Sequence, residues 1–259
     1  MRLTRHRLAA FGWAFWALFV PLLAGPVSGN AASNEFTAEQ RKQIEAIIKD
    51  YLVKNPDVLM DALQAAEDKV KADSRDKASA ALVSRKHDLY EDPASPVGGN
   101  PNGDVSLVEF FDYRCPYCKQ VEPALERLLT EDQKLRFIYK EYPVLGADSR
   151  MAARAALASR KQGKYEATHR ALMALKGQID EATVMKTAAS VGVDVERLKQ
   201  DMKAPDIDKA LEANNDLADA LDIRGTPGFV IGNEIVPGAI RIDEMKVLIE
   251  AARVAAQPK

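Results

Sequence analysis

The N-terminal part of the chain has apolar positions at helical spacing. Thr37 and Gln40 fit a capping box, which predicts that a helix begins there. Apolar side chains then recur three and four residues apart, on one helical face, at Ile44, Ile47, Ile48, Tyr51 and Leu52. Asn55 followed by Pro56 interrupts the pattern, and we expect Asn55 to cap a second helix with Pro56 in its first turn.

The second helix carries an apolar stripe of its own. Its members are alternately four and three residues apart, like the a and d positions of a coiled coil: Leu59, Leu63, Ala66 and Val70. The stripe covers fewer than three heptads, so two interpretations stay open, pairing with another chain and packing on the protein's own domain. Residues 71–86 favour a helix but have little apolar face.

Beyond residue 90 the pattern changes to strands and helices. Residues 91–104 are dense in Pro, Gly, Asn and Asp, which predicts a loop or a domain boundary. The expected elements are, in order, a buried strand over 105–111, a helix over 116–130, a strand over 135–139, a helical block over 149–221, a hairpin of strands over 229–231 and 234–236, and a helix over 242–256. This order predicts an α/β domain.

The first 31 residues have the pattern of a secretory signal. Three arginines precede an apolar run over 8–23, and small residues follow it. We expect cleavage after Ala31 and a periplasmic mature protein. A retained membrane anchor fits less well, because a spanning helix needs about 20 apolar residues, whereas this run is shorter and contains Pro21.

The composition of the chain excludes several classes of function. The 259 residues carry a formal charge of −2, and cleavage would remove three arginines and no acidic residue, which leaves −5. The electrostatic basis for nucleic-acid binding is therefore missing, and no nucleic-acid partner is expected. The chain has no nucleotide-binding glycine motif, HExxH or EF-hand pattern, so we expect neither a cofactor nor a metal site. Two cysteines are too few for a disulfide-dense scaffold.

The two cysteines stand together as Cys115-Pro116-Tyr117-Cys118, where the expected strand ends and the next helix begins. A helix N-terminus stabilises a thiolate, because free N–H groups and the helix dipole face the sulfur. Cys118 lies one turn further on, near enough to attack a mixed disulfide at Cys115. We therefore expect thiol–disulfide exchange. A zinc site or a purely structural disulfide is less favoured, and a Cu(I) site on the two soft thiolates stays an alternative.

Two segments resemble the DsbA family of thioredoxin-fold proteins: FFDYRCPYCKQVEP and, far downstream, GTPGFVIGN. The resemblance implies a thioredoxin fold interrupted by a helical insertion, which the block over about 149–221 would supply. It also implies a cis-proline that faces the redox pair, here the Thr226-Pro227 bond. Cys115, Cys118, Thr226 and Pro227 are the catalytic residues that the resemblance assigns.

The stretch FTAEQRKQIEAIIKDYLVKNPDVLMDAL resembles the N-terminal region of ScsC, the suppressor-of-copper-sensitivity disulfide proteins. Some members of that group trimerise through this region and act as disulfide isomerases, whereas others lack it and are monomeric. Thr226 before the proline and Tyr117 within the CPYC motif also resemble isomerase-type members more than the DsbA oxidase. The resemblance thus implies a homotrimer assembled through residues 36–75.

Glu109 lies in the expected strand, six residues before Cys115, at a position that resembles that of a buried glutamate in DsbA. A buried carboxyl beside thiols would have a raised pKa and could transfer protons, so Glu109 is added to the catalytic candidates. A solvated strand face, or an ion pair with Lys140, stays open. Glu122 is expected to be a helix-surface acid, and His169 to pack or cap locally without a tie to catalysis.

These observations predict an α/β protein: a thioredoxin fold with a helical insertion, preceded by an N-terminal helical segment. The expected division is a signal peptide over 1–31, an oligomerisation segment over 32–90 and a DsbA-like domain over 91–259. The expected function is a periplasmic disulfide isomerase that acts on exported proteins and is reset by a membrane-bound redox partner. A monomeric dithiol oxidase and a periplasmic copper-binding protein are the alternatives.

Overall fold

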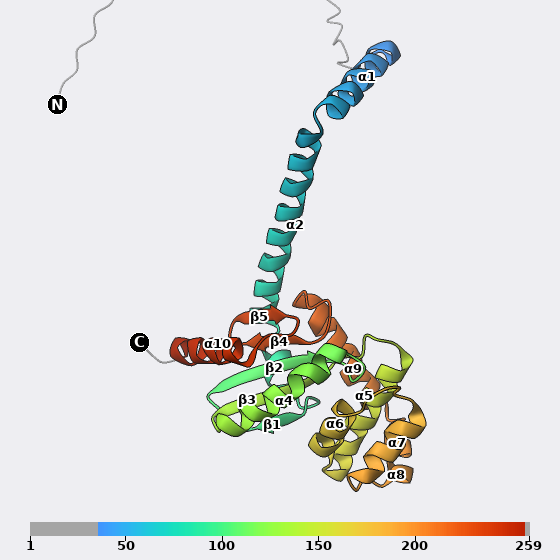
Figure 1. Ribbon diagram of the computed structural model, residues 1–259, viewed down its shortest axis with the longest axis vertical. Coiled ribbons are helices and arrows are strands. Elements are labelled where there is room, and N and C mark those ends of the chain that lie inside the picture. The colour runs from blue at the N-terminus through green and yellow to red at the C-terminus, as the bar shows by residue number, and fades with distance from the viewer. Residues whose placement is uncertain (1–35, 257–259) are drawn as a thin grey trace, which may run out of the picture. The chain divides into compact units, whose positions relative to one another are not determined.

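The computed structural model describes residues 36–256, which form two units that divide between Met60 and Asp61. The predicted signal segment lies outside these residues. The helices are α1 (Ala38–Lys54), α2 (Pro56–Ser84), α3 (Lys86–Tyr90), α4 (Pro116–Glu131), α5 (Ala147–Ser159), α6 (Tyr165–Met173), α7 (Glu181–Ser190), α8 (Val195–Asp201), α9 (Pro205–Ala220) and α10 (Ile242–Ala255), with a 3-10 turn η1 (Arg160–Gln162). The strands are β1 (Val97–Gly99), β2 (Val105–Phe111), β3 (Leu135–Glu141), β4 (Gly228–Ile231) and β5 (Glu234–Pro237) (Figure 1). No described helix is both long and apolar enough to cross a membrane.

The first helix begins as its sequence predicts. The Thr37 hydroxyl accepts the N–H of Gln40, and the Gln40 side chain accepts the N–H of Thr37, which completes the capping box. The role expected for Asn55 is only partly right. Pro56 does begin α2, but the Asn55 side chain donates to the carbonyl of Tyr51 and so closes α1. Every side chain of α1 is at least partly exposed.

Within residues 36–256 the strands form one sheet, in the order β1-β3-β2-β4-β5. The two predicted strands lie side by side at its centre and run parallel, with Val105 opposite Leu135 and Phe111 opposite Glu141. The second is two residues longer than predicted. The short strand β1 lies in the segment that was predicted to be a loop. Backbone pairing with β3 makes these residues a strand, and three residues are too few to show an apolar pattern.

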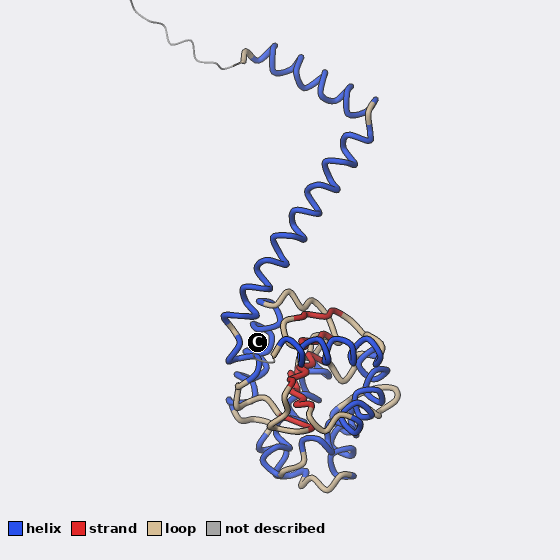
Figure 2. The backbone as a smooth tube through the Cα atoms, turned by 90° about the vertical axis from the view of Figure 1, so that its left-hand side faces the viewer, coloured by secondary structure: helices blue, strands red, loops and turns tan. Residues whose placement is uncertain are grey.

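Alternate residues of β2 face two different cores, as the pleat of a strand requires. One face carries Leu107 and Phe111 and packs against α4, α10 and the helical insertion. The other carries Val108 and Phe110 and packs against the end of α2, α3 and α9. Figure 2 shows helices on either side of the red strands. The sheet is thus buried on both faces at β2, which explains why the run at 105–111 is largely apolar.

The helical insertion lies between β3 and β4, as predicted, and consists of α5 to α9. Its breaks fall at the expected glycines. Gly163 and Gly192 both have positive φ, which a residue without Cβ adopts most readily. Pro205 takes the first position of α9. A backbone N–H at this position has no partner within the helix, so the absence of one in proline costs no hydrogen bond.

The C-terminal end of α2 belongs to the core of the second unit. Ala78 and Leu82 are buried, and Leu82 packs in the core that also holds Val108. The Ser74 hydroxyl donates to Asp222 at 2.6 Å. The core around the sheet therefore includes part of the segment 32–90, so a truncation that isolates the sheet domain has to keep these residues.

Candidate active site

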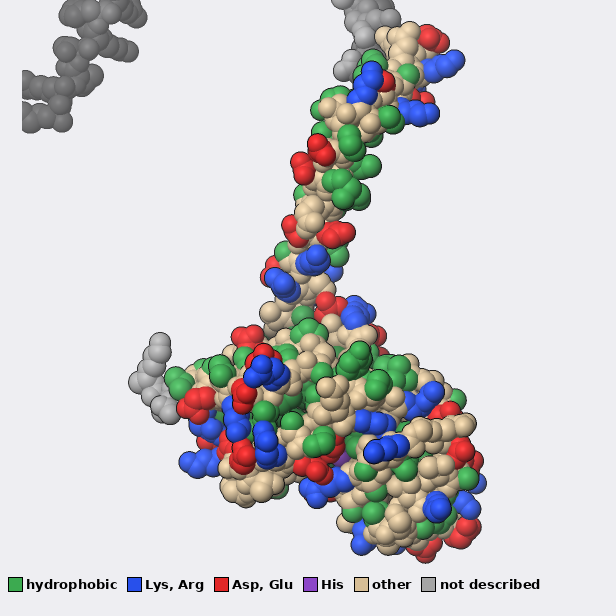
Figure 3. All heavy atoms as spheres, viewed as in Figure 1, with side chains coloured by type: hydrophobic (Ala, Val, Ile, Leu, Met, Phe, Trp, Pro, Cys, Tyr) green, Lys and Arg blue, Asp and Glu red, His purple; other side chains and the backbone are tan. Residues whose placement is uncertain are grey.

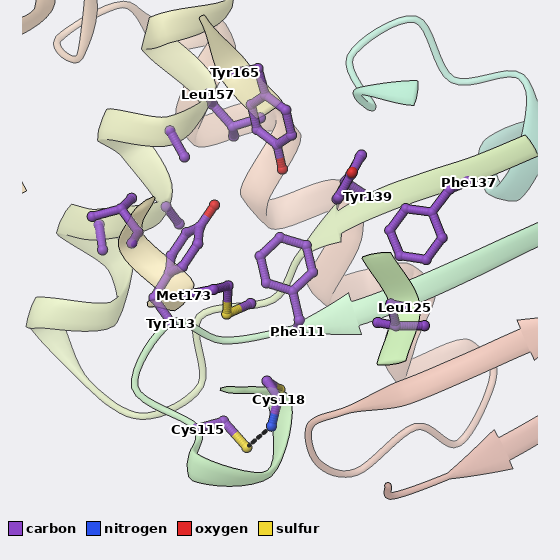
Figure 4. Close-up of a cluster of buried hydrophobic side chains, with 14 of the residues drawn as sticks. Phe111, Tyr113, Cys115, Cys118, Leu125, Phe137, Tyr139, Leu157, Tyr165 and Met173 are labelled. Atoms are coloured by element: carbon purple, nitrogen blue, oxygen red, sulfur yellow. Dashed lines mark hydrogen bonds between the residues drawn. The ribbon is translucent and has the colours of Figure 1, made fainter. Parts of the chain in front are cut away.

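The loop after the central strand β2 places both cysteines at the start of α4. Cys115 is the N-cap residue, and Pro116 holds the first helical position. The N–H of Cys118 donates to Cys115 Sγ at 3.4 Å (Figure 4). Both cysteines are thiols in the described structure. The predicted helix start and the position of the pair at it are confirmed.

Hydrogen bonds strongly favour the thiolate of Cys115. The thiol of Cys118 makes the largest contribution, and Thr226 and the backbone N–H groups of Cys118 and Tyr117 add to it. Burial opposes them, but the balance lowers the pKa of Cys115 to about 5. Above that pH the sulfur is a thiolate, the form that attacks disulfides.

Cys118 has the opposite environment. Its side chain is fully buried beneath Cys115. Burial raises the pKa of its thiol far above the ordinary value, and the hydrogen bond to Cys115 and the charge of Glu109 raise it further. The pair therefore combines one stable thiolate with one thiol that needs a proton acceptor before it can attack.

The segment that faces Cys115 comes from the other end of the domain. The Thr226–Pro227 peptide bond is cis, as predicted. Cys115 Sγ lies 3.1 Å from the carbonyl oxygen of Thr226, to which the protonated thiol donates, across 111 positions of sequence. Pro227 is buried and leads directly into β4. The fold thus brings together four of the five predicted site residues.

Glu109, the fifth, is fully buried in β2. Neither carboxyl oxygen has a hydrogen-bond partner among residues 36–256. Burial raises the pKa of Glu109 well above its ordinary value, and the negative charges of Glu122 and Cys115 add to the shift. The carboxyl is therefore a neutral acid close to the two sulfurs.

The alternative placements of Glu109, on a solvated face or paired with Lys140, are wrong. Glu109 lies opposite Tyr139, one position from Lys140, and neighbouring residues of a strand point to opposite faces. The Lys140 ammonium group instead donates to the carbonyl of Asp88 and to Ser95, and lies 3.3 Å from Asp92.

Glu122 is not the exposed helix-surface acid that the sequence suggested. Its side chain is 13% exposed, and its Oε1 lies 3.4 Å from His169 Nε2. His169 packs in the core, as expected, within a cluster of rings formed by Phe111, Tyr139 and Tyr165. Glu122 lies four residues after Cys118 and three before Leu125, so it falls on the buried face of α4, against which α6 packs.

A third buried acid was missed by the sequence analysis. Glu141 Oε1 accepts the hydroxyl protons of Tyr113 and Tyr165, each at 2.8 Å. Burial raises the pKa of Glu141 to about 8, although the two hydrogen bonds oppose the shift. Tyr113 also lies 3.1 Å from His169 Nδ1. No direct sequence signal pointed to it, since Glu141 lies two residues beyond the buried strand predicted over 135–139.

Asp112 holds the redox loop in place. Its carboxylate accepts the N–H of Arg114 and of Leu145 and the hydroxyl of Ser149, at 2.7 to 2.9 Å. Its carbonyl accepts the N–H of Cys115 at 3.0 Å. The loop before α5 is thereby joined to the cysteine loop. Among residues 36–256 no group of three or more Cys, His, Asp or Glu side chains is placed to hold a metal ion.

Comparison with known families agrees with this geometry. The family model of the DSBA-like thioredoxin domain matches residues 106–250, which include both cysteines and Pro227. The chain belongs to the DsbA-like thioredoxin family. A second match, to the N-terminal domain of the copper resistance protein ScsC, covers residues 40–72. This DsbA-like protein therefore joins the ScsC-type N-terminal segment to a domain of the thiol–disulfide oxidoreductase family.

Solved structures show the same fold. A thioredoxin-like oxidoreductase from Silicibacter pomeroyi is 44% identical, with a TM-score of 0.64, over 65% of this chain and 97% of its own. Proteus mirabilis ScsC in a transitional conformation is 34% identical, with a TM-score of 0.63, over 85% of this chain and 98% of its own.

Curated relatives are more distant. A probable disulfide bond formation protein D from Bacillus cereus is 28% identical over 59% of this DsbA-like chain and 76% of its own length. An Na(+)/H(+) antiporter NhaA from Salinispora tropica is 27% identical over 163 residues, but the chain spans only a quarter of that protein's length.

Proposed function

We propose that this protein is a periplasmic disulfide isomerase, in which Cys115 attacks substrate disulfides and Cys118 resolves the mixed disulfide. The observation that carries the proposal is the lowered pKa of Cys115, about 5, at the N-cap of α4. At neutral pH nearly every molecule then holds a nucleophile ready to react. A thiolate is also a good leaving group, so substrate can depart again, as isomerisation requires.

The chemistry has two steps. The Cys115 thiolate attacks one sulfur of a substrate disulfide, a mixed disulfide forms, and the other substrate sulfur leaves as a thiolate. Resolution follows by one of two routes. A second substrate thiolate displaces Cys115, which isomerises the substrate. Alternatively Glu109, which is neutral at rest, first releases its own proton. Cys118 then gives its proton to the Glu109 carboxylate and attacks Cys115 Sγ, which releases reduced substrate and leaves a Cys115–Cys118 disulfide.

Refolding assays separate isomerase from oxidase. We expect the reduced protein to restore activity to scrambled ribonuclease, and Cys115→Ser to abolish this. Cys118→Ser should accumulate a mixed disulfide with substrate, visible by mass spectrometry. Activity on reduced but never on scrambled ribonuclease would instead support the monomeric dithiol oxidase.

The helices α1 and α2 support assembly of several chains. Their apolar side chains are exposed, with Ile47 at 67%, Tyr51 at 52% and Leu63 at 51% (Figure 3). On α2 the apolar stripe lies along one unbroken helix of 29 residues. An apolar stripe at a/d spacing gains stability when a facing helix covers it. We propose that residues 36–75 form a homotrimer, which would place several Cys115 thiolates around one substrate and raise their effective concentration.

Sedimentation of the full chain tests this assembly. We expect a trimer for the wild type and a monomer for Ile47→Lys combined with Leu63→Lys. The matched control is Lys49→Ala on α1, which changes an exposed polar position and should leave the trimer intact. A wild-type monomer at micromolar concentration would refute the assembly.

A further inference from the structure

Arg114 directly precedes the nucleophile Cys115, and its side chain is exposed. The guanidinium is nevertheless anchored, because its Nη1 donates to the carbonyl oxygen of Leu145 at 2.6 Å. Gly146 lies beside the same nitrogen, since a Cβ added to this glycine would be 3.5 Å from Nη1. Neighbouring Cα atoms are about 3.8 Å apart, so this charge stays within roughly one Debye length of Cys115, about 8–10 Å at physiological salt.

The anchor of Arg114 is a carbonyl oxygen and not a carboxylate. Asp112, the acid closest in sequence, is engaged elsewhere, because its Oδ1 accepts the Arg114 backbone N–H and the Ser149 hydroxyl, and its Oδ2 accepts the N–H of Leu145. Within residues 36–256 the Nε and Nη2 groups of Arg114 have no acceptor. These two groups form the fork that binds a carboxylate through two parallel hydrogen bonds.

Two other cations near the redox pair differ from Arg114 in this respect. Arg224, on the segment that leads to the cis-proline, lies 2.7 Å from the carboxylate of Asp222. Lys119, which directly follows the second cysteine, uses its ammonium group to donate to three backbone carbonyls at the end of α6. Of these three cations, Arg114 is the one whose donors are left for a ligand.

The attacking sulfur is itself an anion. Because the pKa of Cys115 is about 5, the sulfur is a thiolate at neutral pH, and the whole chain has a formal charge of −2. A client carboxylate beside the client's own cysteine is therefore repelled by the group that attacks it. A guanidinium next to Cys115 offsets this repulsion, and it gives no such help to a neutral or basic client.

The loop that anchors Arg114 is fixed before any client binds. Asp112 accepts the N–H of Leu145 and Arg114 donates to its carbonyl, so the backbone of Leu145 is held from both sides. The side chains of Val144 and Leu145 are 44% and 43% exposed, which places apolar surface next to the charge. A surface that is already ordered costs little further entropy when a client binds.

We propose that Arg114 is a specificity-determining residue that binds a client carboxylate close to the client's cysteine, so that acidic segments are favoured substrates. The inference rests on the function proposed above and leaves its chemistry unchanged. The Cys115 thiolate attacks a client disulfide, a mixed disulfide forms, and the client's other sulfur leaves as a thiolate. Arg114 exchanges no proton or electron in this step.

Matched peptide disulfides test this charge preference in the full chain. The substrates are symmetrical disulfides of one blocked tripeptide, Gly-X-Cys, in which X is Asp, Asn or Lys. Attack is measured at low salt in a Cys118→Ser background, by acid quenching and mass spectrometry of the mixed disulfide. The variants are Arg114→Gln, which removes the charge, and Arg114→Lys, which keeps the charge but lacks the fork. The matched control is Arg127→Gln, an exposed arginine of α4 that lies about 16 Å beyond the helix start.

We expect Arg114→Gln to lower the ratio of the rate constants for the Asp and Asn peptides by about 2- to 5-fold, the range for an exposed ion pair. The ratio for the Lys and Asn peptides should rise. Arg114→Lys should keep part of the preference, and Arg127→Gln should leave both ratios unchanged. The difference between wild type and Arg114→Gln should shrink in about 1 M salt, where the Debye length is about 3 Å.

An unchanged ratio for the Asp and Asn peptides in Arg114→Gln would overturn the proposal. Equal slowing of all three peptides would overturn it as well, since Arg114 would then act only on the fold or on the sulfur. Arg114→Lys carries the test if Arg114→Gln does not fold. Failure of the proposed function is distinguishable: no mixed disulfide with any peptide refutes attack by Cys115, whereas reaction without charge preference refutes only the role of Arg114.

Discussion

The lowered pKa of Cys115 predicts that the reduced protein loses stability in acid through one identifiable group. Hydrogen bonds at the start of α4 lower this pKa from 9.0 to about 5 in the folded protein. A group whose folded pKa is depressed stabilises the fold fully above the unfolded value, and this contribution is lost as the pH falls through the folded value. The contribution should therefore shrink steadily as the pH falls from 9 and be almost gone at pH 5, and only in the reduced form, since a disulfide has no thiolate.

The magnitude follows from the two pKa values. At pH 7 the thiol of the unfolded chain is almost fully protonated, whereas in the folded protein the pH lies two units above the pKa of Cys115. At about 1.4 kcal/mol per unit, the thiolate then contributes up to about 3 kcal/mol to the free energy of unfolding at pH 7. Solvent next to the exposed Pro116 and Tyr117 screens part of it, so the measured value should be somewhat smaller.

Urea unfolding of reduced and oxidised protein between pH 4 and pH 7 measures this difference. Thiolate absorbance near 240 nm gives the pKa directly, with Cys115→Ser as the blank. Cys118→Ala should raise the pKa of Cys115, because it removes the largest stabilising contact. A titration midpoint near pH 8.5, the value of an unperturbed thiol, would refute the reasoning, as would identical pH dependence in the two redox forms.

Three further changes test the packing around the site. Leu82→Ala at the end of α2 should cost about 2–4 kcal/mol of unfolding free energy in a urea titration, since Leu82 is buried in the core, whereas Val83→Ala at its exposed neighbour should cost less than about 0.5 kcal/mol. Lys140→Met should cost about 2–4 kcal/mol, because Lys140 is buried and its loss leaves polar partners unsatisfied; an unchanged urea midpoint would show that those partners rehydrate. Glu109→Leu should stabilise the protein by about 1–3 kcal/mol at pH 7, and the gain should grow as the pH rises above the ordinary carboxyl pKa of 4.5, since ionisation then favours the unfolded chain; a gain independent of pH would contradict the raised pKa of Glu109.

The elements that the sequence predicted well share one property. The strands predicted at 105–111 and 135–139, the helix after Cys115 and the hairpin at Gly232-Asn233 each have a strong local signal, such as a mostly apolar run, a proline at the first helical position or a turn dipeptide. The strand β1 has no such signal, because its three residues become a strand only through pairing with β3. Local pattern therefore predicted the centre of the sheet and missed its edge.

The candidate site divides in a similar way. Cys115 and Cys118 are three positions apart in sequence, and the chemistry of this spacing at a helix start was evident without a structure. The face of β2 that carries Glu109 was not evident from the sequence, because the surroundings of each face depend on which core packs against it. Glu122 and His169 are 47 positions apart in the chain and meet only because α6 packs against α4.

By itself the sequence determined the redox pair, the helical insertion and the order of the elements, since these depend on residues that are neighbours in the chain. Only the tertiary structure decided the protonation of the site. A pKa depends on burial and on charges within a few ångströms, and those are supplied by β3, α6 and the Thr226–Pro227 segment, which are far from Cys115 in sequence. The cysteines identify the reaction, and the packing around them decides which sulfur is the thiolate and which side chains can carry its protons.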